Sequence, residues 1–349
     1  MQNINYSDMS IIPRSKIDNF LLKNFYKEIH PNKDISKVSD WKTNFLSNEG
    51  IEPLVILYND NVIAHAGIIP LKVMIEGNIY IASWYIDLSI LPQFQRMGLG
   101  TMITKEWMKL TDIHITHCNE KSMGIFKKLG WLQSPESYYH IYLINPFQIR
   151  KKLIDIIPEK IKLLLNKFTK PILIYFYRKY VIYNNNLYFE NLNKTTLKKF
   201  LDKLIIPNCG IIPIRDKEYA YWRFLDSPEC KKYKLVSYKG KNNFFVIIKL
   251  YGKNNEQYLD ILWISNPFNK KLIRSMISSI ALWALKNSII YIRQYTSDIH
   301  LSNYLKKSLK PIVRHPIFAY NSIDKRLIKK LTKKNWNWEL LDSDLENFI

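Results

Sequence analysis

The chain has 349 residues, which exceeds the length of one ordinary core, and its 47% hydrophobic and 14% aromatic content is ample for globular packing. Its 52 basic and 30 acidic residues give a net charge of +22, which would suit polyanions such as nucleic acid, anionic lipid or coenzyme phosphates. The sequence shows no recognition-helix or zinc-finger pattern. We therefore interpret the charge mainly as a composition rich in Lys, Asn and Ile, and expect no nucleic-acid partner.

Cysteine and histidine spacing argues against disulfides and metal sites. The three cysteines are odd in number and have no ligand-like spacing. His114 and His117 are interpreted as ordinary strand residues, because no carboxylate pair lies near them in the sequence. The N-terminus lacks a signal-peptide pattern, and the most apolar run, 171–177, is too short to span a bilayer. We expect a cytoplasmic protein with no metal and no transmembrane segment.

Periodicity predicts alternating strands and helices along the first 145 residues. Residues 13–48 have the spacing of two helices. The elements expected next are strands at 54–58, 62–75 and 78–92, a helix at 98–110, a strand at 112–117, a helix at 120–129 and a strand at 136–143. Pro92 ends a strand and Gly130 ends a helix. This series predicts a mixed sheet flanked by helices, in the α/β (α+β) class.

A glycine-containing loop lies between the third strand and the following helix. It reads Gln95-Arg96-Met97-Gly98-Leu99-Gly100. A strand that ends in such a turn and opens a helix presents free backbone N–H groups together with the positive end of the helix dipole. The two glycines carry no Cβ, so main chain can approach a phosphate closely. The loop is therefore a predicted anion site.

Three motifs in this half resemble those of the GNAT superfamily of N-acetyltransferases. Leu88-Ser89-Ile90-Leu91-Pro92 resembles the family's Leu-x-Val-x-Pro strand, and residues 95–100 resemble its Gln/Arg-x-x-Gly-x-Gly/Ala pyrophosphate loop. Residues 119–131, with Asn-x-x-Ser-x-x-Ile-Phe-Lys-Lys-Leu-Gly-Trp, are similar to its second signature, Asn-x-x-Ala-x-x-Leu-Tyr-x-x-x-Gly-Phe. The three motifs occur in the family's order and at its separations.

The resemblance implies acetyl-CoA as co-substrate and assigns residues to it. The strand residues Leu88, Ser89 and Ile90 would offer main-chain groups to the pantetheine, as an added strand does. The amides that would hold the pyrophosphate belong to Gln95, Arg96, Met97, Gly98, Leu99, Gly100 and Thr101. Asn119 would direct its side-chain amide at the coenzyme arm near the reaction centre, and Ser122 belongs to the same signature.

The family's usual acid and base are both replaced in this sequence. Phe126 stands where the family commonly has a Tyr acid, and Trp84 stands where it commonly has a Glu base. Asp87 is the best remaining carboxylate, and we expect it to act as base or amine anchor; a strand-end hydrogen-bonding role is its alternative. Asn119 is the second candidate catalytic residue.

The second half repeats the element order of the first without its glycine loop. Residues 150–164 alternate basic and apolar positions, which suggests a linker helix packed between domains or, alternatively, a helix on a membrane surface. The elements expected after it are a helix at 195–204, strands at 233–238, 244–251 and 257–264, a long helix from 272, a strand at 289–295, a helix at 300–309 and a strand at 312–320. The turn at 265–269 has no glycine, so we predict a degenerate copy without a coenzyme site.

The predicted domains are a GNAT N-acetyltransferase domain over 1–145, a basic amphipathic helical linker over 146–185 and a degenerate GNAT-like domain over 186–349. Double-domain GNAT-like proteins of bacterial surface-glycan biosynthesis are similar in build. They show similar, less specific patterns, which here are Trp84-x-x-Asp87, Lys128-Leu129-Gly130-Trp131, Arg215-x-x-Glu218-Tyr219-x-x-Trp222-Arg223 and Asp342-Ser343-Asp344.

The resemblance implies acyl transfer from acetyl-CoA to an amine. The acceptor is left open among an amino sugar on a glycan precursor, an amino acid and a polyamine. One alternative is Fem-type aminoacyl transfer from aminoacyl-tRNA, which would give the basic charge a purpose but does not rely on a Gln-x-x-Gly-x-Gly loop. The other is a non-catalytic binding protein that keeps the fold only, which the missing Tyr would suit.

Overall fold

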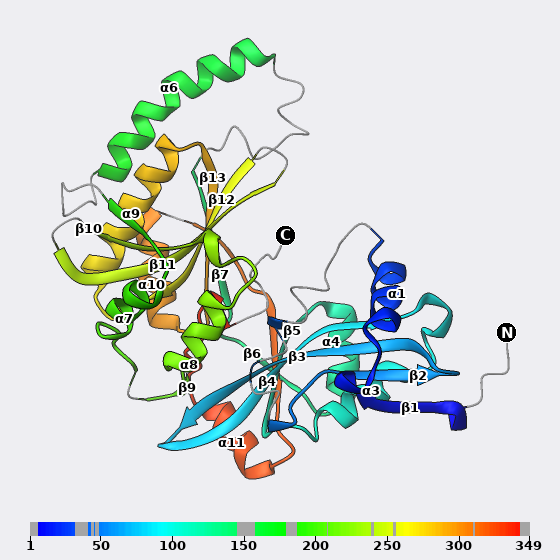
Figure 1. Ribbon diagram of the computed structural model, residues 1–349. Coiled ribbons are helices and arrows are strands. Elements are labelled where there is room, and N and C mark those ends of the chain that lie inside the picture. Colours follow the sequence, from blue (N-terminus) through cyan, green and yellow to red (C-terminus); the bar gives the residue numbers. More distant parts are fainter. Residues whose placement is uncertain are drawn as a thin grey trace.

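The computed structural model describes residues 6–31, 41–42, 45, 49–144, 158–178, 187–207, 209–238, 241–253, 256–309 and 311–342, which form two sheets with helices packed on them (Figure 1). The elements up to residue 178 are β1 (Met9–Pro13), α1 (Asn19–Ile29), β2 (Leu54–Tyr58), β3 (Asn61–Ile75), β4 (Asn78–Ile90), α3 (Leu99–Trp107), β5 (Ile113–Cys118), α4 (Glu120–Lys128), β6 (Leu132–Ser134), β7 (Tyr138–Leu143) and α6 (Glu159–Arg178). Those after it are β8 (Leu187–Asn191), α7 (Lys194–Leu201), β9 (Ile211–Pro213), α8 (Lys217–Ala220), β10 (Tyr233–Tyr238), β11 (Lys241–Lys253), β12 (Glu256–Ile264), α9 (Lys270–Lys286), β13 (Ile289–Thr296), α10 (Ile299–Leu309), β14 (Ile312–Arg314), β15 (Ile317–Asn321) and α11 (Lys325–Lys333).

The first sheet has the strand order β1-β2-β3-β4-β5-β15-β6, and β9 pairs with the outer part of β3. All its pairs are antiparallel except β4 with β5. The middle of β4, from Ala82 to Ile86, is buried on both faces, as its run of apolar and aromatic residues predicts. Tyr85 contacts Thr104 of α3 on one face of the sheet, and His65 contacts Tyr26 of α1 on the other. The sheet is therefore covered on both sides.

The second sheet repeats this plan in the order β14-β7-β13-β12-β11-β10-β8. Its one parallel pair is β12 with β13, and the helix between them, α9, packs on β13. The parallel pair, the long antiparallel strand beside it and the connecting helix correspond to β4, β5, β3 and α3. The predicted mixed α/β architecture, GNAT-like and repeated, is confirmed.

Each sheet contains one strand from the other half of the chain. β7 pairs with β13 in the second sheet, although it follows the elements of the first. β15 pairs with β5 in the first sheet, although it follows those of the second. The domain boundaries at 145 and 185 stay predictions. A fragment ending at 145 would lack β15, the strand that pairs with β5.

The strand predicted at 312–320 is wrong as a single element. β14 ends at Arg314 and lies beside β7 in the second sheet, whereas β15 begins at Ile317 and lies in the first. Pro316 separates them and cannot donate a ladder hydrogen bond. The chain crosses from one sheet to the other at this proline. Of the helices predicted over 13–48, α1 forms at Asn19–Ile29, and residues 32–40, 43–44 and 46–48 lie outside the described part.

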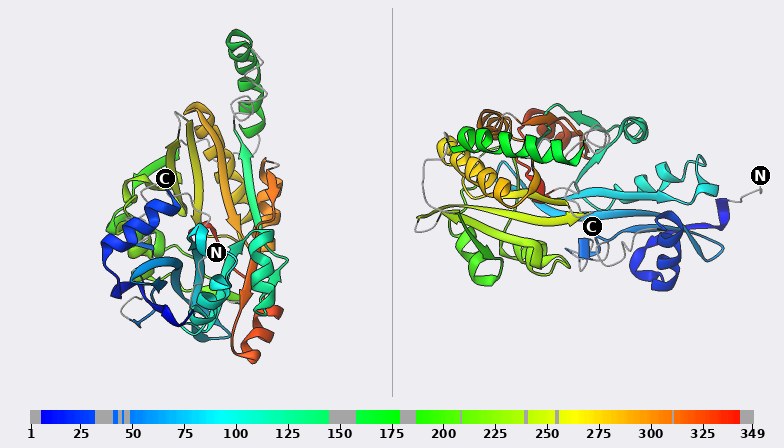
Figure 2. Two further views of the ribbon diagram at one scale, coloured as in Figure 1. Left: turned by 90° about the vertical axis from the view of Figure 1, so that its right-hand side faces the viewer. Right: turned by 90° about the horizontal axis from the view of Figure 1, so that it is seen from above.

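One core is shared by the two sheets, and a second belongs to the later sheet alone. The shared core joins Trp84 and Trp107 of the first half with Phe245 and Trp263 of the second. The second core lies between the β11–β13 strands and the helices α9 and α10. α6 packs on α9, on the outer side of the second sheet, rather than between the two sheets (Figures 1 and 2). Among the described helices, none has the length and apolar content needed to cross a bilayer.

Candidate functional site

The parallel strands β4 and β5 pair over only three residues and then separate. Their last pair is Trp84 with Ile115, while β4 continues beside β3 as far as Ile90. Thr116 Oγ1 donates to the carbonyl of Tyr85 at 2.8 Å. This hydroxyl satisfies the first β4 carbonyl beyond the last pair, where β5 no longer can. The two strands diverge from Tyr85 onward.

A bulge in β4 marks the divergence. Three steps along β4, from Ile86 to Ser89, face two steps along β3, from Gly67 to His65. Asp87 occupies the extra position with φ of +50°, in the left-handed region. A Cβ at Gly67 would lie 3.0 Å from both the carbonyl oxygen and a side-chain carbon of Ile86, so any larger residue opposite the bulge would force Ile86 to shift by a few tenths of an ångström. Sequence reasoning missed this use of Gly67.

Beyond the bulge, main-chain groups of β4 face away from β3. The Leu91 amide donates to Ile63 O at 3.0 Å. Because neighbouring residues of an antiparallel strand alternate in direction, the amide and carbonyl of Ile90 point to the side that β5 has left. The side chain of Gln95 donates to this Ile90 carbonyl at 3.1 Å. Gln95 therefore ties the loop to the strand end.

The loop and the first turn of α3 present unbonded amides beside this strand end. Gly98 caps α3 with φ of +78°, and its carbonyl accepts from the amides of Thr101 and Met102 at 3.0 and 3.1 Å. Within the described residues, no backbone carbonyl accepts from the amides of residues 96–100. A Cβ built on Gly98 would meet nothing within 4 Å. The predicted anion site is thus sterically open at Gly98 and stands at a helix N-terminus.

Packing fixes α3 beneath the diverging strand. A Cβ at Gly100 would lie 3.6 Å from side-chain carbons of Leu88 and Ile90, so these side chains rest on the first turn of the helix. Thr104 Oγ1 donates to Gly100 O at 2.6 Å and also bonds the Tyr85 hydroxyl at 2.8 Å. Burial raises the pKa of Tyr85, so its hydroxyl stays protonated. Tyr85 therefore helps to position the helix through Thr104.

Asn119 and Ser122 form a capping box at the start of α4. Asn119 Oδ1 accepts from the Ser122 amide at 2.9 Å, and Ser122 Oγ accepts from the Asn119 amide at 3.1 Å. Asn119 is exposed and Ser122 is half-buried. The structure therefore gives both residues a local role, and their contact with a coenzyme remains a prediction. Burial raises the pKa of the preceding Cys118 to about 11, which leaves its thiol a poor nucleophile.

The neighbouring strand β3 holds a histidine that sequence reasoning missed. His65 lies directly across from Ser89, and its Nε2 is 3.1 Å from the hydroxyl of Tyr26. Burial lowers the pKa of His65 to about 4; the positive charge of Arg14 lowers it further, and Asp87 opposes both. The signal was a single histidine within the apolar run of β3. His65, Ser89 and exposed Asp87 meet at the bulge.

The positions of the family's usual acid and base are filled by packed aromatic rings. Phe126 is buried, with its ring centroid 4.7 Å from that of Trp131. Trp84 is fully buried and stacks on His117 with centroids 4.9 Å apart. Burial lowers the pKa of His117 to about 3. His114 instead packs on Trp107, on the opposite face of β5, so the two histidines cannot share a metal.

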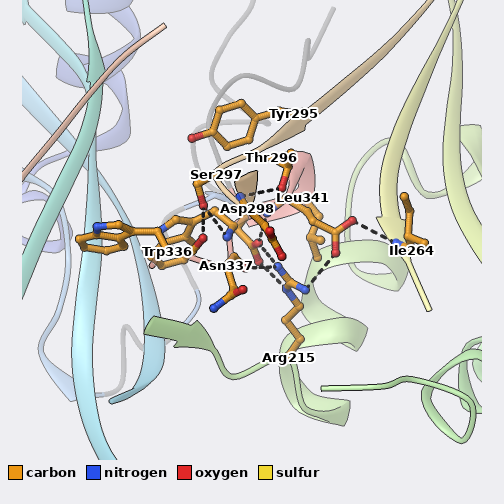
Figure 3. A network of polar contacts seen from close by, with 12 residues as sticks. Arg215, Ile264, Tyr295, Thr296, Ser297, Asp298, Trp336, Asn337 and Leu341 are labelled. Atoms are coloured by element: carbon orange, nitrogen blue, oxygen red, sulfur yellow. Dashed lines mark hydrogen bonds and ion pairs between the residues drawn. The ribbon is translucent and has the colours of Figure 1, made fainter. Parts of the chain in front are cut away.

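The corresponding parallel pair of the second sheet also separates, but its divergence is filled. The last pair of β12 and β13 is Ile261 with Gln294, and a bulge follows between Ile261 and Trp263. The chain's own segment 336–342 lies between the strand ends (Figure 3). Glu339 forms a bridge with Thr296 and accepts from the Ile264 amide at 3.1 Å. One residue thereby contacts both strands.

Buried charges hold this segment in place. Arg215 donates to Glu339 at 3.2 Å and makes two hydrogen bonds to Asp342, one of them 2.9 Å long (Figure 3). Burial raises the pKa of Glu339 to about 8; Arg215 lowers it and Asp342 raises it further. The side chains are nearly inaccessible, so the Arg215 charge depends on Asp342, while Glu339, which its raised pKa keeps protonated at neutral pH, accepts a hydrogen bond from Arg215. The segment 336–342 is named the C-terminal plug below.

The second-half sequence pattern folds around this plug. Arg215 holds Asp342, and Arg223 Nε donates to Leu341 O at 2.8 Å. Trp222 exchanges hydrogen bonds of 3.0 and 2.9 Å with the backbone and indole of Trp41 in the first half. Residues 343 and 344 of the predicted Asp-x-Asp lie outside the described part. The pattern predicted from sequence is thus a structural clamp on the C-terminal plug.

A separate apolar pocket lies far from the β4 bulge. It has a volume of about 230 Å³ and is lined by Met74, Ile212 and the 204–207 loop, among others. Met74 lies nine residues along β3 from His65, which corresponds to roughly 30 Å at the rise of a strand. This pocket therefore does not belong to the candidate site.

The segment that builds the candidate site matches a known family. Residues 17–131 match the family model described as the acetyltransferase (GNAT) family. The match includes the β4 bulge, the loop 95–100 and the start of α4. No curated protein matches the chain.

Solved structures share the fold at low sequence identity. A GCN5-related N-acetyltransferase from Kribbella flavida aligns over 91% of this chain and 71% of its own, at 11% identity and a TM-score of 0.56. A putative acetyltransferase from Pyrococcus horikoshii covers 97% of this chain and 96% of its own, at 10% identity and a TM-score of 0.51. Saccharomyces cerevisiae N-myristoyltransferase with bound myristoyl-CoA covers 90% of this chain and 79% of its own, at 12% identity and a TM-score of 0.56. The likeness to GNAT-type structures therefore extends through both halves.

Proposed function

We propose that this protein is an N-acyltransferase that takes an acyl group from acyl-CoA, with acetyl-CoA as the expected donor, and passes it to an amine. The observation that carries the proposal is the set of unbonded amides at residues 96–100, placed beside the outward-facing Ile90. Myristoyl-CoA bound to the structurally similar yeast enzyme supports a coenzyme A thioester as the ligand class.

The donor would be held mainly by backbone. The amides of residues 96–100 and the dipole of α3 would take the pyrophosphate. The outward groups of Ile90, with its neighbours Leu88 and Ser89, would pair with the pantetheine amides. The thioester would then lie near the bulge at Asp87. Exposed Arg96 and half-buried Thr101 line the same loop and helix start and complete the predicted donor site.

The chemistry requires one proton to leave the amine and one to reach the sulfur. The amine nitrogen attacks the thioester carbonyl carbon, a C–N bond forms, and the C–S bond then breaks with release of the coenzyme thiolate. Asp87 is the exposed carboxylate at the bulge and would anchor the amine or accept its proton. His65 is buried and is held by Tyr26, so it would support the bulge beside Ser89 without touching the amine. The coenzyme would leave as the thiolate and take up its proton afterwards, because Phe126, at the position of the family's usual Tyr acid, has no proton to donate.

The proposed acceptor is an amino sugar or glycan precursor, with an amino acid or a polyamine as alternatives. The enzyme is proposed to be cytoplasmic and of the double-domain type. The three aromatic side chains nearest the site in sequence, Trp84, Tyr85 and Trp131, are all buried. They cannot stack on a sugar face. Product analysis by mass spectrometry with acetyl-CoA and a panel of amino sugars, amino acids and polyamines will identify the acceptor.

Substitution of Gly98 tests donor binding. Gly98→Glu would place a carboxylate among the phosphate-binding amides, and we expect calorimetry to show coenzyme A affinity at least 100-fold weaker. Gly77→Glu is the matched control, because Gly77 has nearly the same φ, +81°, and equally open surroundings at the far end of β4. Both variants carry the same backbone strain. Equal affinity in the two variants would remove the donor-site assignment.

A thermal-shift titration separates the proposal from its alternatives. Stabilisation by acetyl-CoA, in proportion to its concentration, supports the N-acyltransferase. Stabilisation by aminoacyl-tRNA alone would favour Fem-type transfer, and no response to either would favour a protein that keeps only the fold.

A further inference from the structure

α6 is attached to the fold along only part of its length. Leu173 and Ile174, near its C-terminal end, pack against the second core. Figures 1 and 2 show the helix at the outer edge of the molecule, with one end projecting beyond the second sheet. A helix of 20 residues is about 30 Å long. Among the described residues, none forms a layer over much of α6.

Large apolar side chains form a stripe on the uncovered side of α6. Ile161, Leu164, Phe168 and Ile172 are between 47% and 65% exposed. Their spacing of three, four and four residues puts them on one helical face, and Tyr175 continues it. Leu173 and Ile174 point the other way, toward α9. The stripe runs for about 16 Å over eleven residues, at 1.5 Å per residue.

Positive charge accompanies the stripe. α6 contains five basic residues and one acidic residue, Glu159 at its first position. Lys167, Lys170 and Arg178 are exposed. An exposed apolar stripe of this size on a protein with net charge +22 is exceptional for a surface in contact with water alone. Hydrocarbon suits the stripe, and anionic headgroups suit the exposed cations that the same helix carries on its other faces.

We propose that α6 docks the protein on an anionic membrane surface, lying in the interface with its apolar stripe among the acyl chains. The charge of the helix selects this partner, because a bilayer of anionic lipid presents negative headgroups and hydrocarbon in one plane. Contact is peripheral, since no described helix can cross the bilayer. The inference is independent of acyl transfer, because α6 contributes nothing to the bulge site.

Vesicle flotation with the full-length protein tests the docking. Wild type is mixed with vesicles of phosphatidylcholine alone or with 30% phosphatidylglycerol, at about 0.1 M salt, where screening is moderate. We expect wild type to bind the anionic vesicles only. The double variant Leu164→Asp with Phe168→Asp should bind them at least tenfold more weakly. Phe20→Asp is the matched control, because Phe20 is 67% exposed on α1 and Phe168 is 65% exposed on α6. The control should bind as wild type does.

A charge-matched pair separates α6 from the general basicity of the chain. Lys167→Glu with Lys170→Glu should weaken binding at least tenfold, whereas Lys325→Glu with Lys329→Glu, on exposed sites of α11, should change it less than twofold. Equal loss from the two pairs would overturn the proposal, as would equal binding to uncharged vesicles. Sedimentation without vesicles completes the test. A wild-type dimer that the α6 apolar variant converts to monomer would identify the stripe as a protein interface and also overturn it.

Discussion

The two parallel strand pairs of this protein diverge in the same way and end differently. β4 and β5 separate beside a glycine-capped helix start whose amides are unbonded, whereas β12 and β13 separate around the C-terminal plug. In the second sheet, Glu339 takes the Ile264 amide, so a carboxylate of the chain itself satisfies a strand end. Diverging strands leave polar groups that need a partner. These main-chain groups can be bonded either by a ligand or by another segment of the same chain.

The residues that follow each strand explain the difference. After β4 the chain reads Gln-Arg-Met-Gly-Leu-Gly, and Gly98 lets it turn into α3 with φ of +78°. After β12 the chain reads Ser-Asn-Pro-Phe-Asn, and Asn269 caps α9 through its side chain, which accepts from the Leu272 amide at 3.1 Å. That cap uses a donor that an anion would otherwise use. The second site is closed both by its loop and by the plug.

The largest effect should come from removing the cation that holds the plug. Arg215→Ala leaves Glu339 and Asp342 buried without their common partner, and we expect a loss of about 3–5 kcal/mol in the free energy of unfolding. Urea denaturation measures it. Lys199→Ala, which removes an exposed ion pair with Glu190, is the control and should cost less than about 1 kcal/mol. If the two variants lose equal stability, the plug does not depend on this charge network.

Acid should weaken this protein through its buried histidines, one of which, His140, lies in the second sheet with its pKa also lowered to about 4 by burial. His65, His114 and His117 lie in the first sheet, and burial lowers their pKa values to about 4, 4 and 3. The unfolded chain takes up these protons near pH 6.5, so the stability they contribute is present above that pH and is lost as pH falls toward 4. His117→Phe keeps a ring beside Trp84 and should reduce the stability difference between pH 8 and pH 5 by on the order of 2 kcal/mol. An unchanged difference would show that His117 does not stay neutral.

The bulge residue should matter to catalysis and not to donor binding. We expect Asp87→Asn to lower kcat/KM about tenfold or more while calorimetry shows unchanged coenzyme A affinity. Asp60→Asn is the control, since Asp60 also has a positive φ, +59° against +50°, in the exposed β2–β3 turn. A pH–rate profile of Asp87→Asn identical to that of wild type would dismiss a role as base.

The last effect concerns the titration of the plug, and its sign is opposite to that of the histidines. The folded chain holds the Glu339 proton up to about pH 8, whereas an unfolded glutamate releases it near 4.5. The stability that this group contributes is therefore full below 4.5 and is lost as pH rises to 8. Glu339→Gln should flatten urea stability between pH 6 and pH 9. Parallel curves for the variant and wild type would place the pKa of Glu339 below this range.

Most elements followed from local patterns, and the partners of two strands did not. The apolar runs of β3 and β4, the glycine loop and the stop at Gly130 can each be identified within a few residues. The exchange of β7 and β15 cannot, because a strand carries no local mark of which sheet it joins. The single long strand predicted at 312–320 failed for that reason, although Pro316 was a readable sign of the break.

For the candidate site too, the sequence predicted the features that depend on adjacent segments and missed those that depend on distant ones. The loop amides lie where its sequence predicted, because their positions depend on one strand and one helix that are adjacent in the chain. His65 and the plug depend on contacts between distant segments. Tyr26 reaches His65 from 39 residues away, and Arg215 reaches Asp342 from 127. Asn119 was predicted to contact the coenzyme, and this stays a prediction; the structure shows in addition that its side chain caps α4.

The pairing of β15 with β5 determines when the first sheet can be completed during synthesis. β5 pairs with β15, which follows it by roughly 200 residues, so the first sheet stays incomplete until β15 has left the ribosome. During those seconds of synthesis the edge of β5 has no neighbour and would be exposed to other nascent chains. A chain that stopped just before Ile317 would lack both β15 of the first sheet and the plug of the second.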